Sequence, residues 1–198
     1  MMVKICGITC LEDAQVAVNE GASAIGFNFY KSSPRYIAPK TAAGITAGLT
    51  ESTLKVGVFV NESPADVAAV AKTVGLDVVQ LHGQETIDQA PQGYRVWKAF
   101  RVNADFSANL LRSFPAEAYL LDSPTDLYGG SGHTFDWNLA RDLGARIILA
   151  GGLDASNVRQ AVAVAQPWGV DACSRLESTP GKKDRAKLTA FLRALKNL

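Results

Sequence analysis

The chain has 198 residues, of which 47% are hydrophobic and 20% charged, and its 20 basic and 19 acidic residues leave a net charge of +1. This composition is typical of a globular domain with a sizeable core and excludes disordered and collagen-like proteins. The near-neutral charge provides no field to attract nucleic acid or an anionic membrane. We therefore expect one domain over residues 1–198.

Short apolar, β-branched runs alternate with amphipathic segments along the chain. Eight runs are predicted to be strands: 3–8, 24–29, 54–60, 78–83, 95–100, 118–123, 146–152 and 169–174. This alternation is typical of parallel sheets. Eight units are the number in a (β/α)8 TIM barrel, for which about 200 residues is a lower limit. An open, doubly wound sheet has the same alternation, and periodicity alone does not separate the two.

Helices are predicted where start signals precede apolar stripes. Thr9 and Glu12 resemble a capping box at the start of the first helix. Ser63 followed by Pro64 predicts another start. The last helix is expected over residues 183–196. The segments after strands 4 and 5 are short, which predicts that one or both helices there are reduced to a turn.

Polar residues near the ends of apolar strands are the first candidates for chemistry. Side-chain alternation places Lys4 and Cys6 on one face, and a nearby cation favours the thiolate that a general base needs. A free cysteine is otherwise most often a small buried hydrophobe. Asp122 ends an apolar run, where a carboxyl group is suited to act as a general acid. A cap or a loop-ordering hydrogen bond is the alternative for Asp122.

Other polar residues are expected at the same rim of a barrel, because catalytic groups collect at the carboxyl ends of its strands. Asn28 ends strand 2, His82 ends strand 4 and Lys98 lies late in strand 5. His82 could stack, donate a hydrogen bond or cap its strand. Arg35, in the loop after strand 2, could pair with a substrate carboxylate, or be an ordinary surface arginine.

Two segments could bind a phosphate through backbone N–H groups. They are Gly151-Gly152 after strand 7 and 174–177 after strand 8, the place of the phosphate site in TIM barrels. The glycine-rich loop 128–133 lacks the Lys-Ser/Thr of a P-loop, and we expect it to form a lid before a helix opened by 135–137.

Cysteine content and the lack of long apolar segments indicate the cellular compartment. Cys6, Cys10 and Cys173 are an odd number without CxxC spacing, which argues against a disulfide framework or a zinc site. We assign Cys10 and Cys173 to packing. No secretory signal is recognisable, and no apolar stretch reaches the roughly 18 residues that span a bilayer. We expect a cytoplasmic protein without a membrane partner.

Taken together, the motifs resemble those of the phosphoribosylanthranilate isomerases over essentially the whole chain. The segments that carry the resemblance are VKICGIT at 3–9, GFNFY with SPRYI at 26–37, VGVFVNE at 56–62, VQLHG at 79–83, LLDS at 120–123, YGGSGHTFDW at 128–137, LAGGL at 149–153 and PGKKD at 180–184. This resemblance implies the TIM barrel and an Amadori rearrangement in tryptophan biosynthesis.

The resemblance also implies roles for the candidate residues. Asp122 would protonate the furanose ring oxygen of N-(5-phosphoribosyl)anthranilate, and Cys6 would remove the C2 proton of the resulting Schiff base. No metal or organic cofactor is implied, since the iminium is the electron sink. Arg35 would hold the anthranilate carboxylate. Backbone N–H groups at Gly152 and around Ser174 and Arg175 would hold the phosphate, with Gly151 and His82 also facing this small-molecule substrate.

One segment departs from the family pattern. Where the family usually has Ser-Ser-Gly-Val-Glu, this chain has Cys173-Ser174-Arg175-Leu176-Glu177. Arg175 would be strained if the glycine needs a positive φ; alternatively, its guanidinium adds a phosphate contact, which we favour.

Two other functions share parts of this pattern. A related isomerase of histidine biosynthesis would use paired aspartates, but strand 1 ends in Cys6. A non-catalytic barrel that binds a phosphorylated ligand stays open, and the sequence does not separate a monomer from a homodimer.

Overall fold

Eight parallel strands close into a barrel in the computed structural model, which describes residues 1–103, 106–123 and 134–196. The strands are β1 (Met2–Ile5), β2 (Ala24–Asn28), β3 (Leu54–Phe59), β4 (Val78–Leu81), β5 (Arg95–Arg101), β6 (Ala118–Asp122), β7 (Ile147–Leu149) and β8 (Gly169–Ala172). Each pairs in parallel with the next, and β8 pairs with β1. The predicted (β/α)8 barrel is confirmed, and the open sheet is excluded by this closure.

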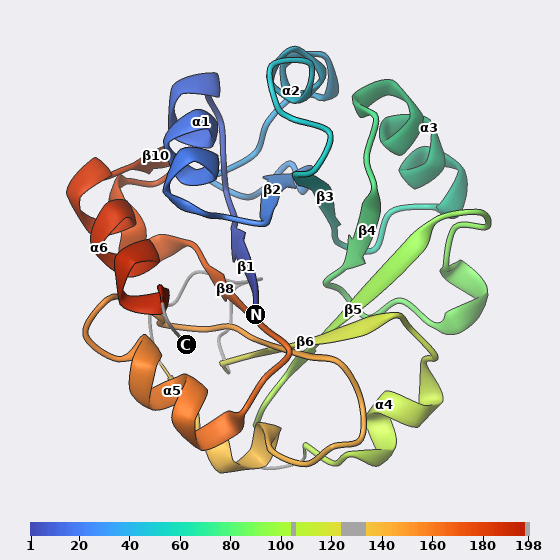
Figure 1. The fold of residues 1–198 in the computed structure, drawn as a ribbon. Coiled ribbons are helices and arrows are strands. Elements are labelled where there is room, and N and C mark those ends of the chain that lie inside the picture. Colours follow the sequence, from blue (N-terminus) through green and yellow to red (C-terminus); the bar gives the residue numbers. More distant parts are fainter. Residues whose placement is uncertain (104–105, 124–133, 197–198) are drawn as a thin grey trace.

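Helices form a ring outside the strands (Figure 1). They are α1 (Leu11–Glu20), α2 (Pro39–Thr46), α3 (Pro64–Val74), α4 (Asn109–Ser113), α5 (Val158–Ala165) and α6 (Arg185–Leu195). A single 3-10 turn, η1 (Ile87–Gln89), follows β4, and α4 after β5 is short, so the predicted shortening there is confirmed. The helix expected from 135–137 is also only a 3-10 turn, η2 (Trp137–Ala140).

Helix starts agree with the sequence only in part. Ser63 caps α3 as predicted, since its hydroxyl accepts a hydrogen bond from the Asp66 backbone N–H. The predicted capping box of α1 is wrong: Cys10 is the N-cap, and the Thr9 hydroxyl donates to the Gly181 carbonyl 2.5 Å away. A partner distant in sequence therefore takes the place of the local cap.

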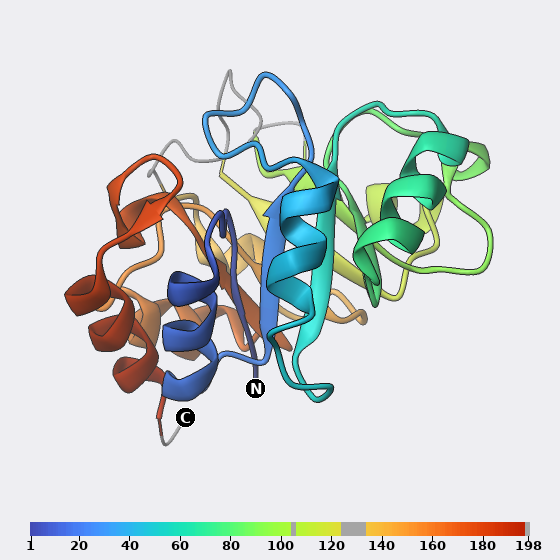
Figure 2. The same cartoon turned by 90° about the horizontal axis from the view of Figure 1, so that it is seen from above.

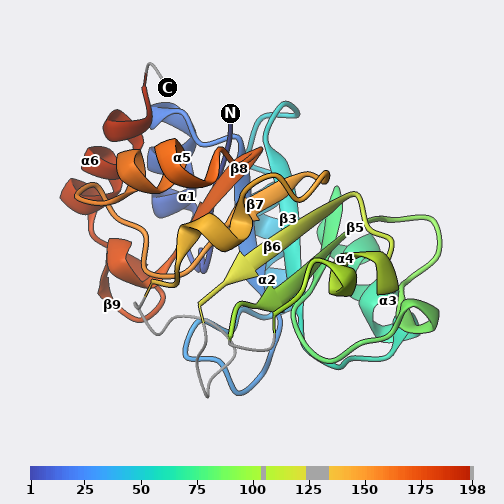
Figure 3. The ribbon, with the colours of Figure 1, turned by 90° about the horizontal axis from the view of Figure 1, so that it is seen from below.

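The start of the last helix is set by a hairpin that the sequence did not predict. Strands β9 (Glu177–Thr179) and β10 (Lys182–Lys183) pair in antiparallel fashion after a 3-10 turn, η3 (Ser174–Leu176). Because Lys183 belongs to this hairpin, α6 begins at Arg185 with Asp184 as its N-cap. Figure 3 shows α6 beside α1 and α5 on one side of the barrel.

Strand alternation separates two cores. Side chains pointing inward fill the barrel interior: Met2, Ala24, Val56, Val78, Trp97, Ala99, Ala118, Leu120, Ile148 and Ala150. Side chains pointing outward pack against the helices in a second, larger cluster. The inward series continues to polar residues where the strands end, so that Cys6 and Asp122 stand above the apolar interior.

The two ends of the barrel differ. Figure 2 places the N-terminus at one end and the long loop after β2 at the other. The carboxyl ends of the strands lie at the latter end, where TIM-barrel active sites are found. No helix within 1–103, 106–123 and 134–196 is long and apolar enough to cross a membrane.

Candidate active site

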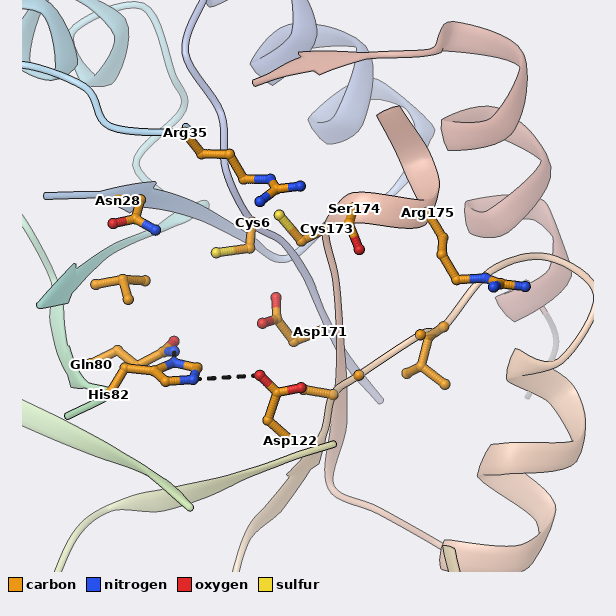
Figure 4. A pocket seen from close by; sticks show the side chains of 15 residues that line it. Cys6, Asn28, Arg35, Gln80, His82, Asp122, Asp171, Cys173, Ser174 and Arg175 are labelled. Atoms are coloured by element: carbon orange, nitrogen blue, oxygen red, sulfur yellow. Dashed lines mark hydrogen bonds and ion pairs between the residues drawn. The ribbon is translucent and has the colours of Figure 1, made fainter. Parts of the chain in front are cut away.

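A pocket at the carboxyl ends of the strands is lined by all the residues predicted to react with or bind the substrate (Figure 4). Those residues are Cys6, Arg35, His82, Asp122, Gly151, Gly152, Ser174 and Arg175. Three further polar residues that line it were not predicted for the site: Gln80, Asp171 and Cys173. The assignment of Cys173 to packing is therefore wrong, because its thiol faces the pocket.

Cys6 is buried and follows β1, two residues after Lys4 on the same inward face. A hydrogen bond with Cys173 and the positive charge of Lys4 outweigh burial and hold the pKa of Cys6 well below its ordinary value of 9.0. The predicted influence of Lys4 on the thiol is thus present. A thiol whose pKa is lowered in this way is suited to act as a base.

Lys4 is completely buried and forms an ion pair with Asp171, with Nζ 2.9 Å from Oδ1. Burial opposes the charge on Lys4, but the charges of Asp171 and Cys6 raise its pKa above its ordinary value. Burial also opposes the charge on Asp171, and it raises the pKa of this carboxyl group to about 7. Asp171 could have been found from the sequence by the rule that identified Cys6, since it interrupts the apolar run of β8.

Asp122 lies across the pocket from Cys6 in Figure 4 and is the last residue of β6. Its Oδ1 accepts a hydrogen bond from the Ser123 backbone N–H at 2.9 Å, and its Oδ2 lies 3.4 Å from Nε2 of His82. Gln80, also buried, places its Nε2 3.0 Å from Nδ1 of His82. With the Gln80 amide as donor, Nδ1 accepts and the ring proton is on Nε2, the nitrogen that lies 3.4 Å from Asp122.

Arg35 is not an ordinary surface arginine. Its guanidinium makes a bidentate contact with Glu177, with Nε at 2.9 Å from Oε1 and Nη2 at 2.8 Å from Oε2. Lys183, which is buried, also binds Glu177 Oε1 at 3.0 Å. Asn28 organises the same loop, because its Nδ2 donates to the Ser33 hydroxyl, which accepts from the Arg35 N–H. The sequence did not single out Glu177 or Lys183.

The two segments predicted to bind phosphate stand side by side after β7 and β8. Gly151 and Gly152 have φ of 85° and 61°, the left-handed region that favours glycine. A Cβ on Gly151 would lie 2.7 Å from the Ser123 backbone nitrogen and 2.9 Å from Asp122 Oδ1, so the close approach also requires glycine. Ser174 opens the short helix η3, the position of phosphate sites in TIM barrels.

Arg175 lies at the edge of the pocket, in the middle of η3. Its Nε is 2.7 Å from Oδ2 of Asp154, and the side chain is 43% exposed. The non-glycine residues with positive φ in the described ranges are Asn61, Asp142 and Gln166, so the strain considered for Arg175 is absent. The phosphate contact of its guanidinium stays a prediction.

Other predicted features lie away from the pocket or outside the described residues. Lys98 points outward from β5, where its Nζ lies 2.6 Å from the buried Glu85, so its expected place at the rim is wrong. Cys10 is half-buried outside the pocket. The lid loop at 128–133 falls outside the described residues. Within the described ranges, no group of three or more His, Cys, Asp or Glu side chains is arranged to hold a metal ion.

This combination defines a class of protein. A closed parallel barrel whose rim presents a thiol with a lowered pKa opposite a carboxyl group is a TIM-barrel enzyme equipped for acid-base chemistry.

Comparison with known proteins narrows the class. The family model for N-(5'-phosphoribosyl)anthranilate isomerase matches residues 3–194. The isomerase of Solibacter usitatus is 56% identical over 197 residues, covering 99% of this chain and 98% of the relative. Phosphoribosyl anthranilate isomerase from Thermus thermophilus superposes with a TM-score of 0.92 at 37% identity, covering 98% of both chains. The structure of phosphoribosyl anthranilate isomerase from Thermotoga maritima superposes with a TM-score of 0.91 at 44% identity, covering 100% of both chains. The chain belongs to the N-(5'-phosphoribosyl)anthranilate isomerase family.

Proposed function

We propose that this chain isomerises N-(5-phosphoribosyl)anthranilate to 1-(2-carboxyphenylamino)-1-deoxyribulose 5-phosphate, the Amadori rearrangement of tryptophan biosynthesis. The observation that carries the proposal is the placement of Cys6 and Asp122 in one pocket of a chain that belongs to this family. A solved relative that is 40% identical, with a TM-score of 0.87, is in complex with reduced 1-(o-carboxyphenylamino)-1-deoxyribulose 5-phosphate.

Asp122 acts first, as the general acid. It gives its proton to the furanose ring oxygen, the C1–O bond breaks, and the lone pair of the anthranilate nitrogen forms the Schiff base. The carboxylate that remains on Asp122 accepts a hydrogen bond from the Ser123 N–H, and His82 Nε2 lies 3.4 Å from its other oxygen. Both groups lie where they can contact the charged product of this step. His82 is thus assigned a supporting role at the acid, with Gln80 holding its tautomer.

Cys6 acts second, as the general base. Its thiolate removes the proton from C2, and the electrons of the C–H bond move through C1 to the iminium nitrogen. The enolamine that results tautomerises to the ketone product, so no external oxidant or reductant takes part. Lys4, fixed by Asp171, supplies the positive charge that keeps Cys6 ionised before it takes the proton.

Substrate binding is assigned to the two ends of the pocket. Arg35 holds the anthranilate carboxylate, and its contact with Glu177 fixes the direction of the guanidinium. Backbone N–H groups at Gly152 and around Ser174 and Arg175 hold the phosphate. The substrate therefore spans the pocket from the loop after β2 to the loops after β7 and β8, with the reacting carbons between Cys6 and Asp122.

The test follows anthranilate fluorescence during turnover by the purified protein. Cys6→Ser and Asp122→Asn are each expected to lower kcat by about 10²- to 10⁴-fold, the usual contribution of one acid or base. Circular dichroism should show that both variants keep the fold, and Cys10→Ala, outside the pocket, serves as the control with unchanged kcat. Retained turnover in either variant would remove the assigned role. An inactive wild-type protein that binds the reduced product analogue would favour a non-catalytic barrel.

A further inference from the structure

Two cysteines from opposite ends of the chain meet in the pocket. Strands β1 and β8 pair in register, Ile5 with Ala172, and the Cys6 N–H donates to the Ala172 carbonyl at 3.0 Å. Cys6 and Cys173 are therefore the next pair in line, and neighbouring strands are about 4.8 Å apart. Both thiols line the pocket, and Figure 4 shows them next to each other.

The surroundings of Cys6 favour the thiolate. Lys4 stands two residues earlier on the same inward face and is completely buried, so its charge acts on the thiol with little screening. Asp171, which lies on β8, neutralises part of the charge of Lys4. The remaining titratable and charged groups that face Cys6 come from the other elements around the pocket: His82 after β4, Asp122 on β6, Arg35 in the loop after β2, Lys183 on β10 and the Cys173 thiol itself.

The surroundings of Cys173 favour the protonated thiol. Its thiol is a hydrogen-bond donor to Oε1 of Glu177, 3.8 Å from Sγ, so this carboxylate is a second acceptor for the thiol proton beside Cys6. Lys183 is near, with Nζ 3.9 Å from the sulfur, but the same Nζ binds Glu177 Oε1 at 3.0 Å and the Cys173 carbonyl at 3.2 Å. The carboxylate thus offsets the cation that would otherwise ionise Cys173.

We propose that Cys173 is a positioning residue, whose thiol keeps its proton and donates it in a hydrogen bond to the Cys6 thiolate. The proposal rests on the assigned role of Cys6 as the base. Two adjacent buried thiols do not both ionise, because the like charges repel, so one becomes the donor to the other. Lys4 and Glu177 decide which, since the ammonium is beside Cys6 and the carboxylate beside Cys173. The pKa shifts agree: that of Cys6 is lowered and that of Cys173 raised, the hydrogen bond between them being the largest cause of each.

The experiment titrates Cys6 as the only thiol of the chain. The chain has three cysteines, so Cys10→Ala/Cys173→Ala and Cys10→Ala/Cys173→Ser each leave Cys6 alone. Thiolate absorbance at about 240 nm and the rate of iodoacetamide alkylation are followed against pH. Serine retains a donor of similar size and alanine does not, so the pKa of Cys6 should be about one unit higher in the alanine variant. The acidic limb of kcat/KM should move by the same amount.

Equal Cys6 pKa values in the two variants would overturn the proposal. A second measurement covers the case in which the alanine variant does not fold: limited alkylation of Cys10→Ala, read by peptide mass spectrometry, should modify Cys6 before Cys173, and the reverse order would equally overturn it. Failure of the proposed function is a separate result, because thiol titration needs no turnover. Activity retained by Cys6→Ser would remove Cys6 as the base and leave the difference between the alanine and serine variants to decide the role of Cys173.

Discussion

Gly151→Ala tests whether the turn after β7 holds Asp122, the proposed general acid, in place. Gly151 has φ of 85°, and a methyl group there would lie 2.0 Å from the Ser123 hydroxyl, 2.7 Å from the Ser123 backbone nitrogen and 2.9 Å from Asp122 Oδ1. The hydroxyl can rotate away, but the backbone nitrogen cannot. The new methyl group is therefore expected to displace Asp122 and Ser123.

The magnitude follows from two contributions. Left-handed backbone costs a non-glycine residue about 1–2 kcal/mol, and forcing a methyl group into packed surroundings costs about 1–3 kcal/mol more. Gly75→Ala is the matched control, since Gly75 has φ of 70° and nothing within 4 Å of its added Cβ. We expect the control to lose only the backbone contribution, and Gly151→Ala to lose about 2–5 kcal/mol of unfolding free energy.

Urea unfolding gives the two free energies, and fluorescence turnover gives kcat/KM. A displacement of about 1 Å at a reacting group can lower the reaction rate about 10²-fold. We therefore expect kcat/KM to fall by about this factor in Gly151→Ala and to stay unchanged in Gly75→Ala. Equal destabilisation of the two variants, with wild-type kcat/KM in both, would refute the reasoning that the close approach of Gly151 positions Asp122.

The remaining predictions concern three charged groups. Glu177→Gln removes the charge that directs Arg35 and should raise KM about tenfold with a smaller change in kcat, whereas an unchanged KM would separate this ion pair from substrate binding. Lys98→Met leaves the buried Glu85 without its cation and should cost about 3–5 kcal/mol in urea unfolding, with partial recovery in Lys98→Met/Glu85→Gln; a loss below about 1 kcal/mol would contradict it. Because the proposed base, Cys6, must be deprotonated and its pKa is lowered, kcat/KM should fall as pH drops below that pKa, and an acidic limb centred near 9.0 would be the contrary result.

The eight strands were predictable because parallel strands buried on both faces are apolar and short, and each predicted strand overlaps an observed one. Their closure into a barrel was implied by the family resemblance and not by periodicity. Because such strands are buried on both faces, the sequence does not show which side chains point into the barrel. Trp97 and Lys98 are adjacent in one buried strand, and local sequence does not say which of them points into the barrel. Closure of the sheet decides this: Trp97 fills the interior and Lys98 meets Glu85 outside it.

The sequence by itself determined the alternation of eight strands with helices and the strand-end positions of Cys6 and Asp122, because both follow from local periodicity and from alternation along a strand. Only the tertiary structure decided the contacts between distant segments. Lys4 meets Asp171, Arg35 meets Glu177 and Cys6 meets Cys173 because β8 closes against β1 and brings the two ends of the chain to one rim. Register across that closure depends on all eight strands at once, so no local pattern reveals which side chains become neighbours.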